Sequence, residues 1–249
     1  MTQDVFRQDA YLKQCQASVI AVSELGIVLD RTVFYPLGGG QAGDRGEIRA
    51  EGLDGADIAI MDTRKSKDAE GRPSADILHV PAAGQEQALA RLVPGSVVQA
   101  RIDWERRHKL MRFHTATHLL CHLVPQLVNG CSITEEYARL DFNMSDALDK
   151  EALTQGLAAL VAASHPVRIG SVSDAELDAN PALVKSMSVQ PPRGSGSIRT
   201  IRIGEFDLID LQPCGGTHVA NTAEIGAVIV TKIEKKSAMT RRVVLGFAS

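Results

Sequence analysis

Two pairs of residues that could bind a metal ion occur in this sequence, each with its members four positions apart. The first pair is His114 and His118, within a stretch whose apolar residues recur every three or four positions. Such i and i+4 residues project from one helix face with Cβ atoms about 6 Å apart, a span that one metal ion can bridge. Zinc proteases with this spacing carry a glutamate after the first histidine, and Thr115 stands there instead, which disfavours a protease. Alone, the pair is also compatible with chance or with a solvated helix face.

The second pair is Cys214 and His218, in the segment Cys-Gly-Gly-Thr-His. Its two glycines let the backbone turn tightly enough for both side chains to face one point. Three imidazole nitrogens and one sulfur suit zinc, so we predict one Zn²⁺ site with the ligands His114, His118, Cys214 and His218. Four protein ligands would make a closed, structural site; three would leave a position open, Cys214 being the most dispensable, and the sequence leaves both alternatives standing.

The elements that must position these residues change in character near residue 103. Before it, short β-like runs alternate with turn signals, at 17–23, 27–29, 46–49, 58–62, 77–80 and 97–102, with a polar stretch at 63–74 expected to be an exposed loop. After it, helical periodicity covers 104–127 and 146–164, and Ser173 opens a short helix that Pro181 limits. Strands are expected again at 167–172, 198–203, 206–211, 227–234 and 242–247.

These patterns predict an α+β protein with two domains. Residues 1–103 would form a small β-barrel domain that carries a glycine-rich motif, Gly38, Gly39 and Gly40 followed by Gln41. Residues 104–249 would form a two-layer α/β domain, with helices on one face of a mostly antiparallel sheet, that holds the metal.

Composition limits the classes of function. The chain has 249 residues, 27 basic and 30 acidic, for a net charge of −3, and only 4% of its residues are aromatic, which disfavours a base-stacking platform. With no signal peptide, no membrane-spanning run and four scattered cysteines, a cytoplasmic protein is expected. Three basic clusters could still contact phosphates: Arg101, Arg106, Arg107, Lys109 and Arg112; Arg193, Arg199 and Arg202; Lys232, Lys235, Lys236, Arg241 and Arg242.

Longer stretches around the four ligands resemble a known family. These stretches are residues 110–120 and 214–219, together with 32–41, 138–142, 221–226 and 241–243. They resemble the editing domain of alanyl-tRNA synthetases and, more closely, the free-standing AlaX trans-editing proteins of the longer class with a glycine-rich motif. Along the chain, the glycine-rich motif comes first, then the His114–His118 pair, then the Cys214–His218 pair. The resemblance covers nearly the whole chain, which has room for the editing part alone.

The resemblance implies hydrolysis of the ester in mischarged tRNA(Ala), chiefly Ser-tRNA(Ala) and also Gly-tRNA(Ala). It further implies that Gly38, Gly39, Gly40 and Gln41 face the metal site and contact the substrate. A hydroxyl of Thr115 or Thr117 beside the zinc could bond the serine side chain and so reject alanine. Two alternatives remain: a deacylase of another misacylated tRNA, and a non-catalytic tRNA-binding module with structural zinc.

Overall fold

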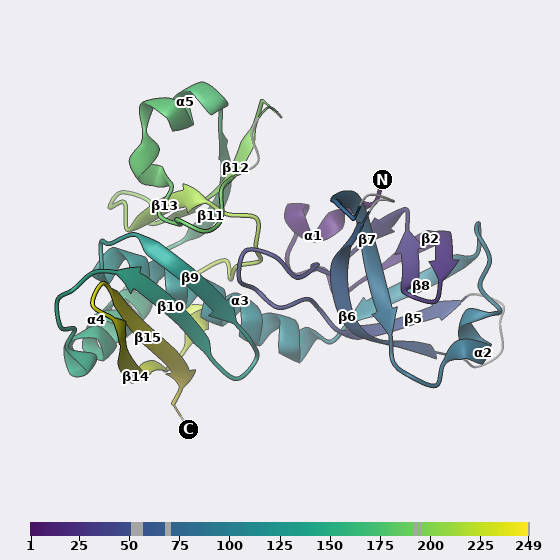
Figure 1. Cartoon of the computed structure of the whole chain (residues 1–249), viewed down its shortest axis with the longest axis horizontal. Coiled ribbons are helices and arrows are strands. Elements are labelled where there is room, and N and C mark those ends of the chain that lie inside the picture. The colour runs from purple at the N-terminus through teal and green to yellow at the C-terminus, as the bar shows by residue number, and fades with distance from the viewer. Residues whose placement is uncertain (51–56, 68–70, 192–193, 195, 249) are drawn as a thin grey trace. The chain divides into compact units, whose positions relative to one another are not determined.

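The computed structural model describes residues 1–50, 57–67, 71–191, 194 and 196–248 (Figure 1). Contacts divide the chain into two compact units. The first comprises Met1–Gly38 and Ala42–His108, and the second comprises Gly39–Gln41 and Lys109–Ser249. Three residues of the glycine-rich motif are thus grouped with the second unit, although the chain on both sides of them belongs to the first.

The first unit is built around six antiparallel strands. They are β2 (Gln14–Ser23), β3 (Gly26–Leu29), β5 (Gly46–Ala50), β6 (Asp57–Lys67), β7 (Pro73–Pro81) and β8 (Val97–Ile102). They pair in the cyclic order β2-β3-β7-β6-β5-β8, so the sheet closes on itself as a barrel. Side chains alternate in and out, and the inward positions include Ile48, Ile58, Ile60 and Val98, all at most 1% exposed. The remaining elements are β1 (Gln3–Asp4), α1 (Val5–Gln8), β4 (Arg31–Thr32) and α2 (Glu86–Leu89).

The prediction of a loop at 63–74 is wrong for most of that stretch. Strand β6 continues to Lys67 and β7 begins at Pro73, and the two pair along Thr63↔His79, Arg64↔Leu78 and Lys65↔Ile77. Thr63 points inward and is fully buried, whereas Arg64 and Lys65 face solvent. The strand was not predicted because the residues on the outer face of this hairpin are polar, and the prediction relied on apolar residues.

A neutral histidine lies in the interior of the barrel unit. His79 is fully buried; its Nδ1 donates to the carbonyl of Ile27 at 3.0 Å, and its Nε2 accepts from the Thr32 hydroxyl at 2.7 Å. Burial, only partly opposed by the bond to Ile27, lowers the pKa of His79 to about 4.

The barrel unit should therefore lose stability in acid because of His79. Between pH 6.5 and about 4 the unfolded chain binds a proton at this residue that the native chain does not, so stability falls as pH falls. The loss from this one group amounts to about 3 kcal/mol between pH 7 and pH 4. Urea unfolding at both pH values should show a flatter dependence for His79→Gln than for the native protein. The exposed His122→Gln serves as the control, and equal slopes for all three proteins would refute the prediction.

The second unit contains the two long helices and two antiparallel sheets. Helix α3 (Trp104–Leu123) enters it at Lys109, and α4 (Lys150–Ala162) packs against β14. The four-stranded sheet has the order β14 (Val228–Ser237), β15 (Thr240–Phe247), β10 (Ala138–Asn143) and β9 (Val128–Ile133); the three-stranded sheet has the order β11 (Val167–Val172), β12 (Ile198–Ile203) and β13 (Asp210–Pro213). The shorter pieces are α5 (Asp174–Ala179), η1 (Pro181–Leu183) and η2 (Thr222–Ile225).

The α+β class with mostly antiparallel sheet is confirmed, and several boundaries differ from the prediction. Helix α3 ends at Leu123, two residues before Pro125, rather than at 127. The Ser173 capping box is present, with Glu176 as its partner. Strands β9 and β10 were not predicted, because glycine, cysteine and charged residues interrupt their apolar pattern. They extend the sheet of β14 and β15, and the second unit contains two sheets where one was expected. Within the described residues, no helix combines the length and apolarity needed to cross a membrane.

Candidate metal centre

The structure brings the four predicted ligands together. His114 and His118 lie one turn apart on α3, while Cys214 and His218 lie on the loop that follows β13. One ligand atom from each residue lies within 4.8 Å of all the others. The three histidines are at most 6% exposed, and Cys214 is half-buried.

The distances within this cluster fit zinc. The Cys214 Sγ atom is 3.5 Å from His114 Nε2 and 3.3 Å from His218 Nε2. With Zn–S near 2.3 Å and Zn–N near 2.0–2.1 Å, a tetrahedral ion would separate sulfur from nitrogen by about 3.6 Å. The donor set and its spacing therefore fit Zn²⁺ with little rearrangement.

Each histidine of the cluster has an oxygen atom on its other ring nitrogen. The Nδ1 atom of His114 lies 2.8 Å from Gln41 Oε1, and that of His118 lies 2.7 Å from Asp210 Oδ2. The Nδ1 atom of His218 lies 3.2 Å from Thr115 Oγ1, whose hydroxyl donates to the carbonyl of Met111 and so accepts from the ring. Such partners place the proton on Nδ1 and leave the Nε2 lone pair for a metal.

Asp210 was not predicted to take part in the site. Its buried carboxylate also accepts from Lys185 Nζ and, at 2.9 Å, from Gln212 Nε2. Burial opposes ionisation, but His118 and Lys185 outweigh it and hold the pKa of Asp210 at about 2. At His118, burial lowers the pKa, but Asp210 and Cys214 together outweigh it and raise the pKa to about 9. The only signal in the sequence was a carboxylate within an apolar run, four residues before Cys214.

The cluster also favours the thiolate of Cys214. Burial would raise the pKa of this thiol, yet the neighbouring imidazoles of His114 and His218 outweigh burial and hold the pKa well below its usual value. The backbone N–H of Gly216 points at the sulfur at 3.4 Å. A thiolate is the form that ligates a metal.

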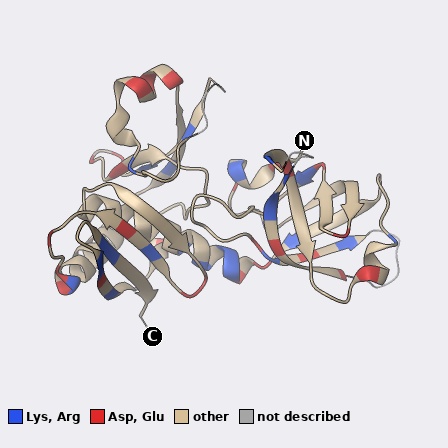
Figure 2. Ribbon diagram, in the orientation of Figure 1, with Lys and Arg blue, Asp and Glu red and all other residues tan. Residues whose placement is uncertain are grey.

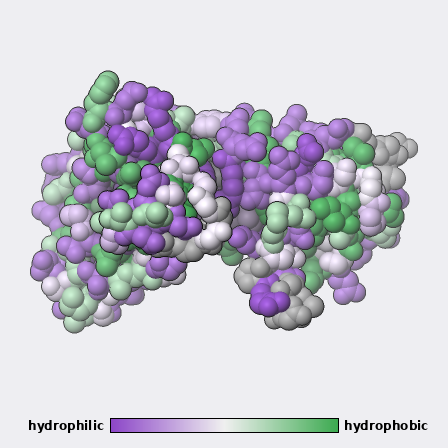
Figure 3. All heavy atoms as spheres, turned by 90° about the horizontal axis from the view of Figure 1, so that it is seen from above, coloured by the Kyte–Doolittle hydropathy of each residue, from purple (hydrophilic) through white to green (hydrophobic). Residues whose placement is uncertain are grey.

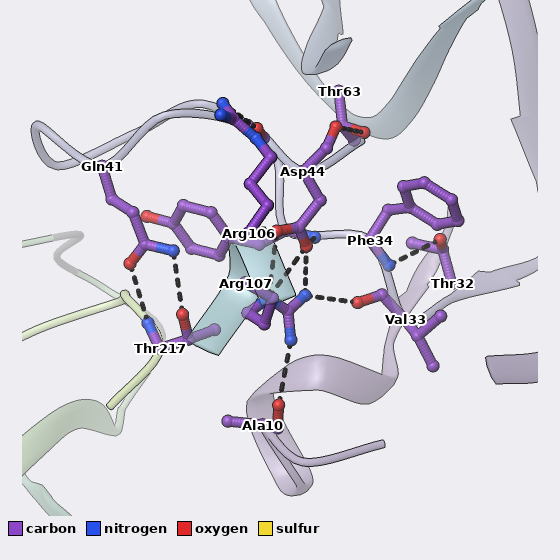
Figure 4. A network of polar contacts seen from close by, with 12 residues as sticks. Ala10, Thr32, Val33, Phe34, Gln41, Asp44, Thr63, Arg106, Arg107 and Thr217 are labelled. Carbon is purple, nitrogen blue, oxygen red and sulfur yellow. Dashed lines mark hydrogen bonds and ion pairs between the residues drawn. The ribbon is translucent and has the colours of Figure 1, made fainter. Parts of the chain in front are cut away.

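The residues predicted to contact substrate make protein contacts in the structure. The Thr117 hydroxyl donates to the carbonyl of His114 at 2.7 Å. The Thr115 hydroxyl bridges Met111 and His218, and the backbone N–H of Val219 also donates to it. Gln41 is fully buried, and its Oε1 atom lies 2.8 Å from His114 Nδ1. Its amide also contacts Thr217 (Figure 4). Substrate contacts by Thr115, Thr117, Gln41 and Gly38–Gly40 stay predictions.

Two arginines of the first basic cluster are buried and not part of a charged surface. Arg106 and Arg107 are 8% and 0% exposed, and Arg107 is paired with Asp44 inside the barrel unit. Arg112 donates to the carbonyl of Ile225 and lies over the Phe247 ring. These arginines satisfy internal acceptors, so the prediction of phosphate contacts is wrong for Arg106 and Arg107.

The other two basic clusters are partly engaged in the same way. Arg199 and Arg202 donate to backbone carbonyls of Cys214 and Gly204, and Arg193 lies outside the described residues. In the third cluster, Arg241 is buried and Arg242 pairs with Asp141. The exposed cations that remain are Arg101, Lys109, Lys232, Lys235 and Lys236; Figure 2 shows charged residues of both signs on the β10–β15 sheet. Hydrophilic and hydrophobic residues are likewise interspersed on the face drawn in Figure 3.

Comparisons with known proteins match both parts of the chain to aminoacyl-tRNA synthetase domains. Residues 198–244, which include the Cys214–His218 loop, match the family model described as "Threonyl and Alanyl tRNA synthetase second additional domain". Residues 6–106 match the model "tRNA synthetases class II (A)". Both parts of the chain are therefore similar to domains of such synthetases, and the Cys214–His218 pair lies within one of these domains.

Relatives along the whole chain identify the family. The chain is 31% identical to the alanyl-tRNA editing protein AlaX-M of Methanosarcina mazei, over 97% of its own length and 95% of that protein. It is also 31% identical to AlaX-M of Saccharolobus solfataricus, over 98% of both. It matches the alanine–tRNA ligase of Metallosphaera sedula with 32% identity, over 94% of this chain but only 25% of the ligase. The chain belongs to the AlaX-M family of alanyl-tRNA editing proteins, which confirms the resemblance found in its sequence.

Proposed function

We propose that this protein hydrolyses the ester bond of mischarged tRNA(Ala), chiefly Ser-tRNA(Ala) and also Gly-tRNA(Ala), with one Zn²⁺ bound by His114, His118, Cys214 and His218. The observation that carries the proposal is the convergence of these four ligand atoms, each imidazole held by its own oxygen partner, in a member of the AlaX-M family. Its class is aminoacyl-tRNA deacylase. We further propose that the boundary between the two domains falls between residues 103 and 104, and that residues 39–41 contribute to the second domain. We also propose that the protein is cytoplasmic.

The protein's own residues would prepare the site for such a reaction. A zinc ion in it would act as a Lewis acid toward the ester or lower the pKa of a bound water toward about 7. Gln41, Asp210 and Thr115 fix the three imidazole rings, and the imidazoles stabilise the Cys214 thiolate. If all four residues bound the ion, no coordination position would remain for substrate. If Cys214 did not bind, one position would be open.

The test is turnover of Ser-tRNA(Ala) by zinc-loaded protein at a substoichiometric concentration, with Ala-tRNA(Ala) as the control. We expect many turnovers of the serine ester and little loss of the alanine ester. His118→Ala should lose bound zinc and at least 100-fold in rate, on the order of a lost metal ligand. His122→Ala, one turn further along α3 and exposed, should retain both.

Two results would overturn the proposal. Zinc-loaded protein that binds tRNA but turns over no serine ester would favour the non-catalytic module, or a deacylase of another misacylated tRNA. Unchanged zinc content in His118→Ala would reject the ligand set.

A further inference from the structure

The tip of the glycine-rich motif, Gly39–Gln41, belongs to the same compact unit as the four clustered residues. The carbonyl of Gly40 accepts from the backbone N–H of Ile133, at the end of β9, at 2.7 Å. Gln41 and Ile133 form an isolated parallel bridge. These backbone contacts fix where the Gln41 side chain begins, directly before the chain returns to the barrel unit at Ala42.

The Gln41 amide joins one predicted ligand from α3 to the loop that carries the other pair. Its Oε1 atom accepts from His114 Nδ1 at 2.8 Å and from the backbone N–H of Thr217 at 3.1 Å. Its Nε2 atom donates to Thr217 Oγ1 at 2.8 Å (Figure 4). Because the Thr217 N–H can only donate, the atom facing it must be the oxygen, which assigns the amide orientation independently of His114.

Glycines on both sides make this approach possible. Gly40 has φ +86°, and a Cβ there would lie 2.8 Å from Cys131 Sγ. A Cβ at Gly216 would overlap the His114 ring and come within 2.9 Å of Gln41 Oε1. The glycine-rich motif and the Cys-Gly-Gly-Thr-His loop therefore both contact the His114 imidazole closely. A larger residue at Gly40 or Gly216 would push the two segments apart.

We propose that Gln41 is a positioning residue for the metal site: its amide oxygen holds His114 as the Nδ1–H tautomer, and the same amide holds the loop of Cys214 and His218 against His114. The inference rests on the metal binding in the proposed function. It gives the glycine-rich motif a role in binding the metal, besides the expected contact with substrate. Gln41 acts through His114 and Thr217 rather than on the reacting atoms.

The test measures metal affinity, which does not depend on activity. Zinc affinity would be determined by chelator competition, and the visible spectrum would be recorded for the Co²⁺-substituted protein. Gln41→Leu removes the amide at similar size and should lower affinity 10–100-fold with a changed Co²⁺ spectrum, the range for lost partners of metal-bound histidine. Gln41→Glu keeps an oxygen acceptor for His114 and should retain affinity within a few-fold. Gln85→Leu is the matched control, because its amide also pairs with the main chain, at Ala59 in the barrel unit.

Each outcome decides the inference. Native affinity in Gln41→Leu, or an equal loss in Gln41→Glu, would overturn it, because the acceptor oxygen would then not matter. If Gln41→Leu fails to fold, Gln41→Asn is used in its place, because it withdraws the same amide by one methylene. The same loss of zinc affinity is expected for it. If the unaltered protein binds neither Zn²⁺ nor Co²⁺, the proposed metal site fails, and the inference fails with it. Native metal binding without ester turnover would reject only the proposed activity.

Discussion

Replacing Arg107 by methionine is expected to lower the free energy of unfolding by about 3–5 kcal/mol, the cost of leaving one partner of a buried ion pair alone. Arg107 and Asp44 have side chains that are 0% and 1% exposed. The guanidinium donates to both carboxylate oxygens of Asp44 and to the carbonyls of Ala10 and Val33 (Figure 4). Methionine fills similar volume but leaves a carboxylate and two carbonyls without these donors, in a place where water cannot replace them.

Arg49→Met is the matched control for this prediction. Arg49 also pairs with an aspartate, Asp57, through two hydrogen bonds in the same barrel unit, but the two side chains are 64% and 39% exposed. Its loss should leave the free energy of unfolding nearly unchanged, because water screens the charges of a surface pair. Urea unfolding of both variants at pH 7 measures the difference. If Arg107→Met lowers the free energy of unfolding no more than Arg49→Met does, the prediction is wrong, and the Asp44 carboxylate is not buried and dependent on Arg107.

The Asp44–Arg107 pair also supports the base of the glycine-rich motif. The backbone N–H of Tyr35 donates to the Asp44 carboxylate at 2.6 Å, and the N–H of Asp44 donates back to the carbonyl of Tyr35 at 2.9 Å. The chain between these two residues contains Gly39–Gln41. An ion pair in the barrel unit therefore closes the loop whose tip carries Gln41.

Spacing was enough to predict that the side chains of His114, His118, Cys214 and His218 lie close together. Positions i and i+4 on a helix must share a face, and two glycines between Cys214 and His218 allow a tight turn. The partners of the imidazoles come from elsewhere in the chain: Gln41 is 73 residues from His114, and Asp210 is 92 residues from His118. No local pattern encodes such pairings. The family resemblance implied that Gln41 faces the site, but its bond to His114 and the role of Asp210 are seen only in the tertiary structure.

Alternating burial does not by itself explain which strands were predicted. Strands β8 and β10 both bury alternate residues, yet β10 was missed, and β11 was predicted although none of its residues is buried. The ranges predicted at 97–102, 167–172 and 198–203 agree with β8, β11 and β12 at both ends. Charge clustering was the least reliable signal, because a count of arginines cannot tell a solvated side chain from Arg107, which is fully buried.

Replacing Asp210 by asparagine is expected to lower zinc affinity by 10–100-fold while the fold is retained. The Asp210 carboxylate accepts from His118 Nδ1 at 2.7 Å, and a charged partner of this kind orients the ring and increases its basicity toward a metal. Asparagine keeps the shape but loses the charge, and its NH₂ group would face either His118 or Lys185, both of which donate to the native carboxylate. Chelator competition on the folded variant measures the change, and far-UV circular dichroism checks the fold.

Two further variants separate the effect on the metal from a general loss of charge. Asp207→Asn, on the exposed turn before β13, removes the same charge three residues away and should leave zinc affinity unchanged. Lys185→Met removes the cation on Asp210 but leaves the carboxylate on His118, so zinc affinity should fall much less than in Asp210→Asn. Equal losses in Lys185→Met and Asp210→Asn would mean that the ion pair as a whole matters, and not the carboxylate that faces His118. Native affinity in Asp210→Asn would overturn the prediction, because the charge on Asp210 would then not be needed to orient His118 for the metal.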